Sequence, residues 1–154
     1  MIKLLGLWLV FFSFAGTGCG MARGLELEWK VAKELLLLVR RIGSEVRCYK
    51  RPLPEIYADF ESEHLGKFLK TLARYGAAAA FAELPTDPAV SRVCLPFFEQ
   101  MGKCSAEECE LLEGECVARL GELINGMEQA VAEKGKVYRS LGLAGGAVAV
   151  ILLI

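Results

Sequence analysis

The sequence lacks the motifs by which most enzymes and nucleic-acid-binding proteins can be identified. It contains no GxxxxGK[ST] loop, no HExxH motif and no nucleophile elbow, and it holds a single histidine. A formal net charge of −1 provides no surplus of Lys and Arg with which to neutralise phosphates, so no nucleic-acid partner is expected. We also expect no cofactor and no small-molecule substrate, and we predict that the chain is not an enzyme.

The one histidine, His64, stands between glutamates in the sequence. Glu61 and Glu63 precede it, and the three side chains could be drawn as an acid-base site. A polar surface histidine next to the charged first turn of a helix explains the same residues, and catalysis would need convergent groups in a pocket. We therefore predict no catalytic residue.

Closely spaced cysteine pairs are also missing, although the chain has six cysteines. Cys19 lies in an apolar segment, and no CxxC pair occurs among the other five, which are Cys48, Cys94, Cys104, Cys109 and Cys116. Zinc requires closer pairs, so no metal site is expected. Cys109 and Cys116 fall on one stripe of a predicted helix, where a free thiol behaves as a small buried hydrophobe. We predict reduced thiols.

The two ends of the chain carry almost no charge. Residues 4–22 have no charged side chain and span about 28 Å as a helix, close to the ~30 Å hydrocarbon core of a bilayer. Residues 137–154 span about 27 Å, and Tyr138 and Arg139 near their start suit the membrane interface. We predict transmembrane anchors over residues 1–22 and 137–154, the second opening with the motif Tyr138, Arg139, Ser140, Leu141 and Gly142.

Two alternatives for these ends stay open. A cleaved signal peptide would show the same Lys3, apolar stretch and small residues, and a lipoprotein signal would use Cys19, although Gly16 stands where such signals usually carry leucine. The C-terminal segment is short enough to dip into one leaflet only. The alternative function is a secreted or lipid-anchored helical protein with a cleaved signal peptide.

Positive charges near the anchors predict the side of the membrane on which residues 23–136 lie. The positive-inside rule places the flank that is richer in Lys and Arg in the cytoplasm, and here that flank holds Arg23, Lys30, Lys33, Lys134, Lys136 and Arg139. Reduced cysteines would agree with this position. We expect a protein of the cell membrane with a cytoplasmic domain at residues 23–136.

Apolar residues of the middle recur at steps of three or four, which predicts an all-α bundle. A long helix continues from the first anchor and ends before Pro52, and shorter helices follow at residues 54–62 and 64–80. Asp87 and Pro88 start another helix, in which Pro96 is expected to cause a kink. Ser105 and Glu108 form a capping box that opens a last helix running into the second anchor.

Charged residues gather at two places in the domain. Basic residues lie at the end of the first long helix and acidic residues at the start of the last. Three explanations stay open: the charges suit the helix dipoles, they attract one another within the bundle, or they offer docking patches for a partner. The candidate partner-binding residues are Arg40, Arg41, Arg47, Glu107, Glu108 and Glu110.

Several segments resemble one family. The opening residues 1–6, the close with Tyr138, Gly142 and Gly145 followed by residues 150–154, and segments at 45–55 and 97–102 are similar to stage III sporulation protein AB of endospore-forming bacteria. Cys104, Ser105 and Cys109 depart from the family's usual residues. The region between Gly76 and Pro96 is shorter than usual.

This resemblance implies a function that the residue pattern alone does not. It implies a helical bundle similar to the F domains of type II secretion, flanked by N- and C-terminal transmembrane helices. It also implies a non-catalytic platform of the stage III A sporulation channel in the mother-cell outer forespore membrane. The implied partners are the lipid bilayer and the other stage III A sporulation proteins, including the AA ATPase.

Overall fold

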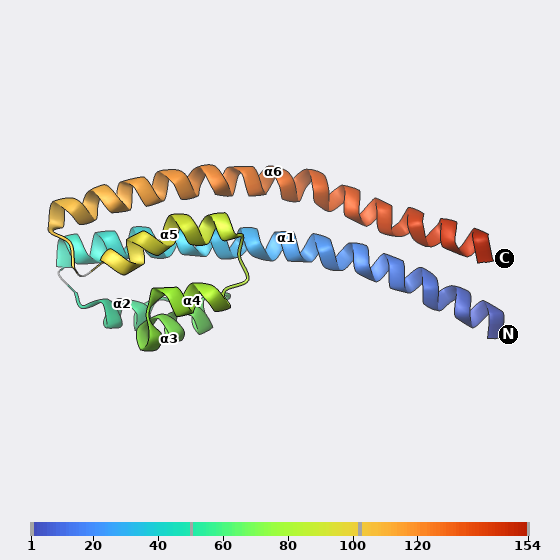
Figure 1. The fold of residues 1–154 in the computed structure, drawn as a ribbon, viewed down its shortest axis with the longest axis horizontal. Coiled ribbons are helices and arrows are strands. Elements are labelled where there is room, and N and C mark those ends of the chain that lie inside the picture. The colour runs from blue at the N-terminus through green and yellow to red at the C-terminus, as the bar shows by residue number, and fades with distance from the viewer. Residues whose placement is uncertain (1, 50, 102, 154) are drawn as a thin grey trace. The chain divides into compact units, whose positions relative to one another are not determined.

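The computed structural model describes residues 2–49, 51–101 and 103–153, although most side chains in 2–19 and 139–153 lie outside the description. Every regular element in these ranges is an α-helix. The elements are α1 (Ile2–Tyr49), α2 (Leu53–Asp59), α3 (Gly66–Tyr75), α4 (Ala77–Glu83), α5 (Pro88–Gln100) and α6 (Ala106–Leu153) (Figure 1). The prediction of an all-α chain is confirmed for the described residues, as are one long helix at each end and the start of α5 at Pro88.

The chain divides into two compact units. One joins Met1–Leu27 with Met127–Ile154, and the other is Glu28–Gly126. In the first unit the two helical segments run antiparallel and end at the same side (Figure 1). Ala22 is buried in this unit, as is Gly135. Both anchors predicted from the sequence fall wholly in this unit. No helix among the described residues is both long enough and apolar enough to span a bilayer.

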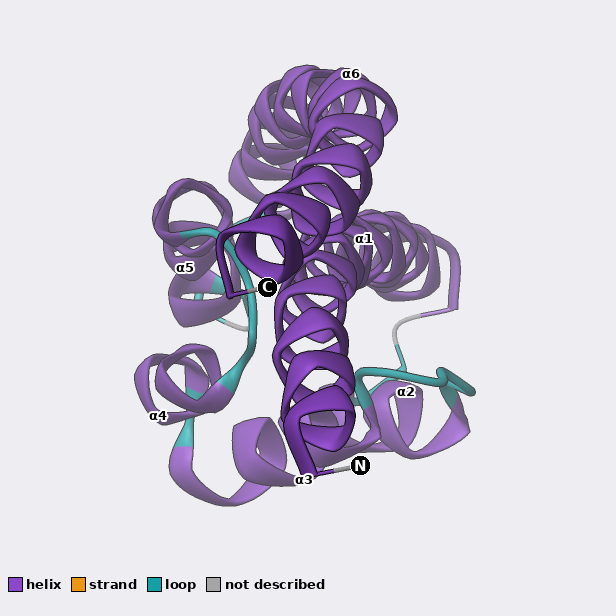
Figure 2. Cartoon of the chain, turned by 90° about the vertical axis from the view of Figure 1, so that its right-hand side faces the viewer, coloured by secondary structure: helices purple, strands orange, loops and turns teal. Residues whose placement is uncertain are grey.

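The core of the unit Glu28–Gly126 forms around the part of α1 that lies within it. Helix α1 runs between α6 on one side and α2, α3 and α4 on the other (Figures 1 and 2). Its apolar side chains at steps of three and four are buried at Val31, Leu35, Leu38 and Ile42, whereas Leu27, one step earlier, is 37% exposed. Each fully buried Val, Leu or Ile side chain stabilises the fold by about 1.5–3 kcal/mol relative to an exposed one.

Four phenylalanines join α3, α4 and α5. The rings of Phe68 and Phe81 have centroids 5.0 Å apart, and both pack edge-to-face against Phe98, at 5.9 and 5.6 Å. Phe97 packs against Phe98 at 5.3 Å in the same manner. Edge-to-face pairs add about 0.5–1.5 kcal/mol each beyond the area they bury, so this cluster fixes the three short helices on one another.

The helix starts follow the predicted capping residues. The Asp87 side chain accepts a hydrogen bond from the N–H of Ala89 at 2.7 Å, with Pro88 in the first turn of α5. At the start of α6, the Ser105 N–H donates to Glu108 Oε2 at 2.9 Å, and the Glu108 N–H donates to Ser105 Oγ at 3.3 Å. These reciprocal bonds confirm the capping box.

One predicted helix is divided in the structure. The sequence predicted a single helix over residues 64–80, but α3 ends at Tyr75 and α4 begins at Ala77. Gly76 between them has φ +86° and ψ 178°, a conformation open almost only to glycine. The alanines at 77–80 favour a helix, so the sequence gives no sign of this break. Helix α2 is also shorter than predicted, because it ends at Asp59.

Candidate partner-binding surfaces

The basic end of α1 and the acidic start of α6 meet within the bundle through Arg47. Its Nη1 lies 3.2 Å from Glu110 Oε1, and its Nη2 lies 2.6 Å from Glu113 Oε2. Gly43, one turn before Arg47, has no side chain, and the Glu113 carboxylate occupies the space that a Cβ there would take. Of the three explanations left open for these charges, attraction within the bundle therefore holds for Arg47 and Glu110.

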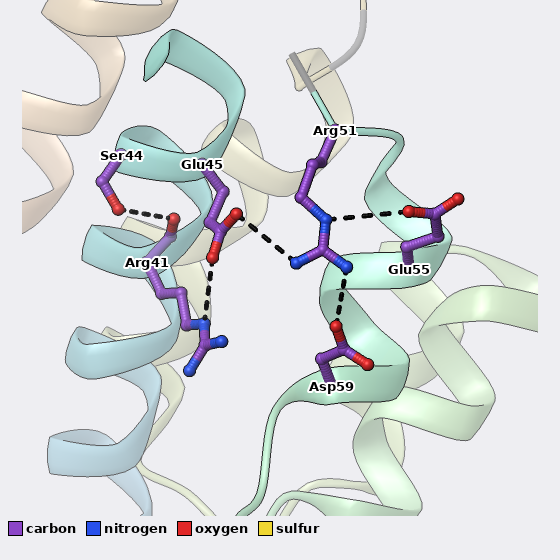
Figure 3. A network of polar contacts seen from close by, with 6 residues as sticks. All are labelled: Arg41, Ser44, Glu45, Arg51, Glu55 and Asp59. Atoms are coloured by element: carbon purple, nitrogen blue, oxygen red, sulfur yellow. Dashed lines mark hydrogen bonds and ion pairs between the residues drawn. The ribbon is translucent and has the colours of Figure 1, made fainter. Parts of the chain in front are cut away.

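A second group of charges ties the end of α1 to α2 (Figure 3). Arg51 Nη2 lies 2.7 Å from Asp59 Oδ2, its Nε lies 3.7 Å from Glu55, and its Nη1 lies 3.6 Å from Glu45. The hydrogen bond with Asp59 is the main reason that the pKa of Arg51 is raised above its ordinary value. Glu45 also pairs with Arg41 Nε at 3.6 Å, so it is shared between two arginines. This network holds α2 in place.

The remaining candidate residues differ in how far the fold uses them. Arg41 is engaged with Glu45, and Glu108 with Ser105. Hydrogen bonds from the backbone N–H and the hydroxyl of Ser105 hold the pKa of Glu108 below its ordinary value. Arg40 and Glu107 are exposed, and neither forms an ion pair with another described residue. These two side chains are therefore the most available to a partner.

His64 has a structural explanation that involves an acid far away in the sequence. Its backbone N–H donates to Glu34 Oε2 of α1 at 3.1 Å. The ring Nε2 lies 4.0 Å from both Glu34 and Glu63. Glu34 thereby fixes the segment before α3 on α1. Sequence reasoning placed Glu61 and Glu63 beside the histidine and missed Glu34, because contacts between distant segments leave no local pattern.

Cys104 and Cys109 form a disulfide, which overturns the prediction of reduced thiols at these positions. Their Cα atoms lie 5.8 Å apart. Cys104 directly precedes the N-cap residue Ser105, and Cys109 is the fourth residue of α6. In a hydrophobic staple, the residues at these two positions pack against each other. The absence of CxxC spacing misled the prediction. A cysteine at each staple position around the capping box was the signal that could have found the pair.

Cys94 of α5 and Cys116 of α6 are free thiols, and both are buried. The neighbouring Cys116 thiol, together with burial, raises the pKa of Cys94 above its ordinary value. The prediction that Cys116 is a buried free thiol is confirmed. Within the described residues, no three His, Cys, Asp or Glu side chains lie close enough together to hold a metal ion.

A cavity of about 240 Å³ lies beside the disulfide. The residues that line it include Gly43, Arg47 and Glu113 of the α1–α6 contact, together with Met101 and both sulfur-bonded cysteines. The charged groups at its wall are already paired with one another. The cavity therefore belongs to the corner where α1, α5 and α6 meet.

The C-terminal motif of the sequence lies in the other compact unit. Leu141 is 62% exposed, and the Ser140 hydroxyl donates to the carbonyl of Val137 at 3.0 Å. Tyr138 is half-buried. The surroundings of Arg139 and Gly142, like those of most residues in the N-terminal anchor, lie outside what the structure describes. No contact of the described residues Tyr138, Ser140 and Leu141 identifies a ligand.

The described part of the chain is thus an all-α bundle whose accessible chemistry consists of charged helix faces. The chain belongs to the family of stage III sporulation protein AB, whose profile it matches over residues 3–83 and 89–154. The match confirms the resemblance seen in the sequence and is interrupted only at the connection between α4 and α5. The chain is therefore a stage III sporulation protein, from a family that is not known as a family of enzymes.

No curated protein matches the chain, and no solved structure matches it.

Proposed function

We propose that the chain is a non-catalytic platform of the stage III A sporulation channel between mother cell and forespore, and that it couples a secretion-type ATPase to the membrane complex. The observation that carries the proposal is the family match, which includes the helical middle of the chain as well as both ends. The exposed charges of Arg40 and Glu107 support it, because such side chains suit binding to another protein.

We further propose that both ends lie in the bilayer and that the unit Glu28–Gly126 faces the mother-cell cytoplasm. The support is in the sequence: residues 4–22 and 141–154 carry no charge, and the basic residues near them favour the cytoplasmic side. The Cys104–Cys109 disulfide argues against this side, because cytosolic thiols are kept reduced. The position of the unit is therefore the part of the proposal that most needs a direct test.

Co-purification from sporulating cells tests the coupling role. The full chain with an affinity tag is expected to retain both the stage III sporulation protein AA ATPase and other stage III A proteins after mild detergent extraction. A tagged, unrelated membrane protein with two anchors serves as the control. Recovery of the stage III A membrane proteins without the ATPase would contradict the coupling role, and recovery of neither would contradict the platform itself.

A further inference from the structure

Two rows of exposed side chains run along the unit Glu28–Gly126, one on α1 and one on α6. The first, which we call the basic row, consists of Lys33, Leu37, Arg40, Ser44 and Arg47. The second, which we call the acidic row, consists of Glu108, Leu111, Glu115, Ala118 and Glu122. Each row thus has three charges of one sign, one leucine and one small residue.

The acids and cations that lie near these rows offset part of their charge, but not all of it. In the basic row Arg47 is paired with Glu110 and Glu113, whereas Lys33 and Arg40 form no ion pair with another described residue. Glu34 and Glu45 of α1 turn towards the bundle, where they contact the backbone of His64 and the side chains of Arg41 and Arg51. On α6, the cation beside the acidic row is Arg119, which lies 2.8 Å from Glu115. Each row therefore keeps its own sign.

The rows have the same length and the same spacing. Residues in both are separated by alternating steps of three and four, which places them on one face of a helix as in a coiled-coil seam. From first to last residue each row spans about 21 Å at 1.5 Å per residue. A row of one copy could therefore cover a row of another along its full length.

An antiparallel alignment of the rows makes the steps coincide. It places each cation opposite a glutamate, in the pairs Lys33–Glu122, Arg40–Glu115 and Arg47–Glu108. It also places Leu37 opposite Ala118, and Leu111 opposite Ser44, so that each leucine meets a small residue. Leu37 is 57% exposed and Leu111 75% exposed, and both would lose contact with water in such a pair.

The direction of the helices within one chain suits this alignment. In the unit Glu28–Gly126, α1 and α6 run in opposite directions (Figure 1). Two copies that stand side by side in the same orientation therefore present α1 of one antiparallel to α6 of the next. Copies that share one membrane have this common orientation under the proposed function.

We propose that the basic row of one copy packs against the acidic row of a second copy of this chain. The two rows are different surfaces, so the contact is head-to-tail and each copy keeps a row free for the next, as in a ring or a filament. A single pair of helices buries less than the ~800 Å² per partner of a standard interface, so association of isolated copies is expected to be weak. The inference concerns self-association and goes beyond the proposed function.

Charge reversal on each row tests the inference with the purified full chain in non-ionic detergent. One variant combines Lys33→Glu with Arg40→Glu, and the other combines Glu115→Arg with Glu122→Lys. Arg47 is left unchanged because it also holds α1 to α6. Each variant alone is expected to self-associate at least about tenfold more weakly than the wild type in sedimentation velocity at low salt.

An equimolar mixture of the two variants is the decisive measurement. The acidic α1 row of the first variant can then pair with the basic α6 row of the second, so association is expected to return to the wild-type level. Unfolded variants could not restore it. The control, Lys70→Glu with Arg74→Glu on α3, makes the same change of charge elsewhere and should associate as the wild type does. High salt should weaken wild-type association, because it shortens the range of exposed charges.

Three results would overturn the inference. They are a wild-type chain that stays monomeric at all concentrations, variants that each associate like the wild type, and a mixture that fails to recover. If the Lys33→Glu, Arg40→Glu variant self-associates normally but no longer retains the ATPase, the basic row is instead the docking surface of that protein. Loss of self-association with the ATPase retained would leave the proposed function standing.

Discussion

At the scale of single residues, the start of α6 depends on a small set of side chains. Ser105 and Glu108 satisfy each other's backbone N–H groups, and the two neighbouring cysteines are joined by a disulfide. The first turn of a helix has N–H groups without partners in the helix itself, so each of these bonds stabilises an end that would otherwise fray. The start of α6 is therefore held both covalently and by hydrogen bonds.

The charge of Glu108 should make this stabilisation depend on pH. Its pKa is lowered in the folded chain from an ordinary value of 4.5, so its contribution is complete above that value and is lost as the pH falls below it. We expect Glu108→Gln to lower the melting temperature at neutral pH and to lose this effect in acid. Thermal unfolding followed by circular dichroism across this range measures the difference.

The neighbouring substitution Glu107→Gln is the matched control, because it removes an exposed first-turn acid that forms no capping bond with Ser105. It reports the general effect of the helix dipole on such acids. A Glu108→Gln deficit that stays constant from neutral to acid pH would show that the charge of Glu108 does not contribute.

The cysteines show what residue-level reasoning can and cannot find. The capping box could be predicted, because Ser and Glu at this spacing have a local physical role. The disulfide around it was not predicted, since two cysteines five residues apart match no metal or redox motif. The contact between Cys94 and Cys116 depends on how α5 packs on α6, which no local pattern encodes.

At the scale of elements, Gly76 decides where α3 ends and α4 begins. Its φ of +86° combined with an extended ψ is a region in which a side chain meets the backbone of its own residue. The turn lets Phe68 of α3 and Phe81 of α4 pack edge-to-face. The break is thus a condition for the aromatic cluster.

Gly76→Ala should therefore destabilise the chain by about 1–3 kcal/mol, the usual cost of a strained backbone conformation. Gly66→Ala is the control, because Gly66 lies in the first turn of α3 with open space around it and no left-handed conformation. It should leave stability unchanged or raise it slightly. Urea unfolding of both variants gives the comparison, and equal stabilities would refute the role assigned to Gly76.

Helices with a clear apolar stripe were the elements that the sequence predicted best. Val31, Leu35, Leu38 and Ile42 are buried as their spacing indicated. The short middle helices were predicted less well, because alanines in the run 77–80 favour a helix without marking where one ends and the next begins. A kink at Pro96 stays a prediction, since α5 continues past that residue to Gln100.

At the scale of the whole molecule, the charged patches could be located in the sequence but not assigned. Whether Arg47 and Glu110 pair within the bundle or face a partner depends on which segments lie next to each other, and that is a property of the packed bundle. The close approach of Glu113 to Gly43 is likewise visible only once α1 and α6 lie side by side. Arg40 and Glu107 remain candidate residues for binding an external partner.

The orientation of the molecule gives the last prediction. A reporter enzyme that is active only in the cytoplasm, fused within the loop at Thr86, should be active if the unit Glu28–Gly126 faces the cell interior. The same chain should be recovered with an intact mass from Met1 to Ile154, which excludes a cleaved signal. Activity of a reporter that works only outside the cytoplasm would place the unit on the opposite side.

The bond between Cys104 and Cys109 has a consequence for anyone who follows this chain in cells. Since compartments differ in their reducing power, the fraction of chains in which this bond is oxidised indicates the compartment in which the chain has been. Free thiols can be alkylated with a light reagent before reduction and the released thiols with a heavy one afterwards. The ratio of the two labels on the peptide that contains both cysteines gives this fraction without a fused reporter enzyme.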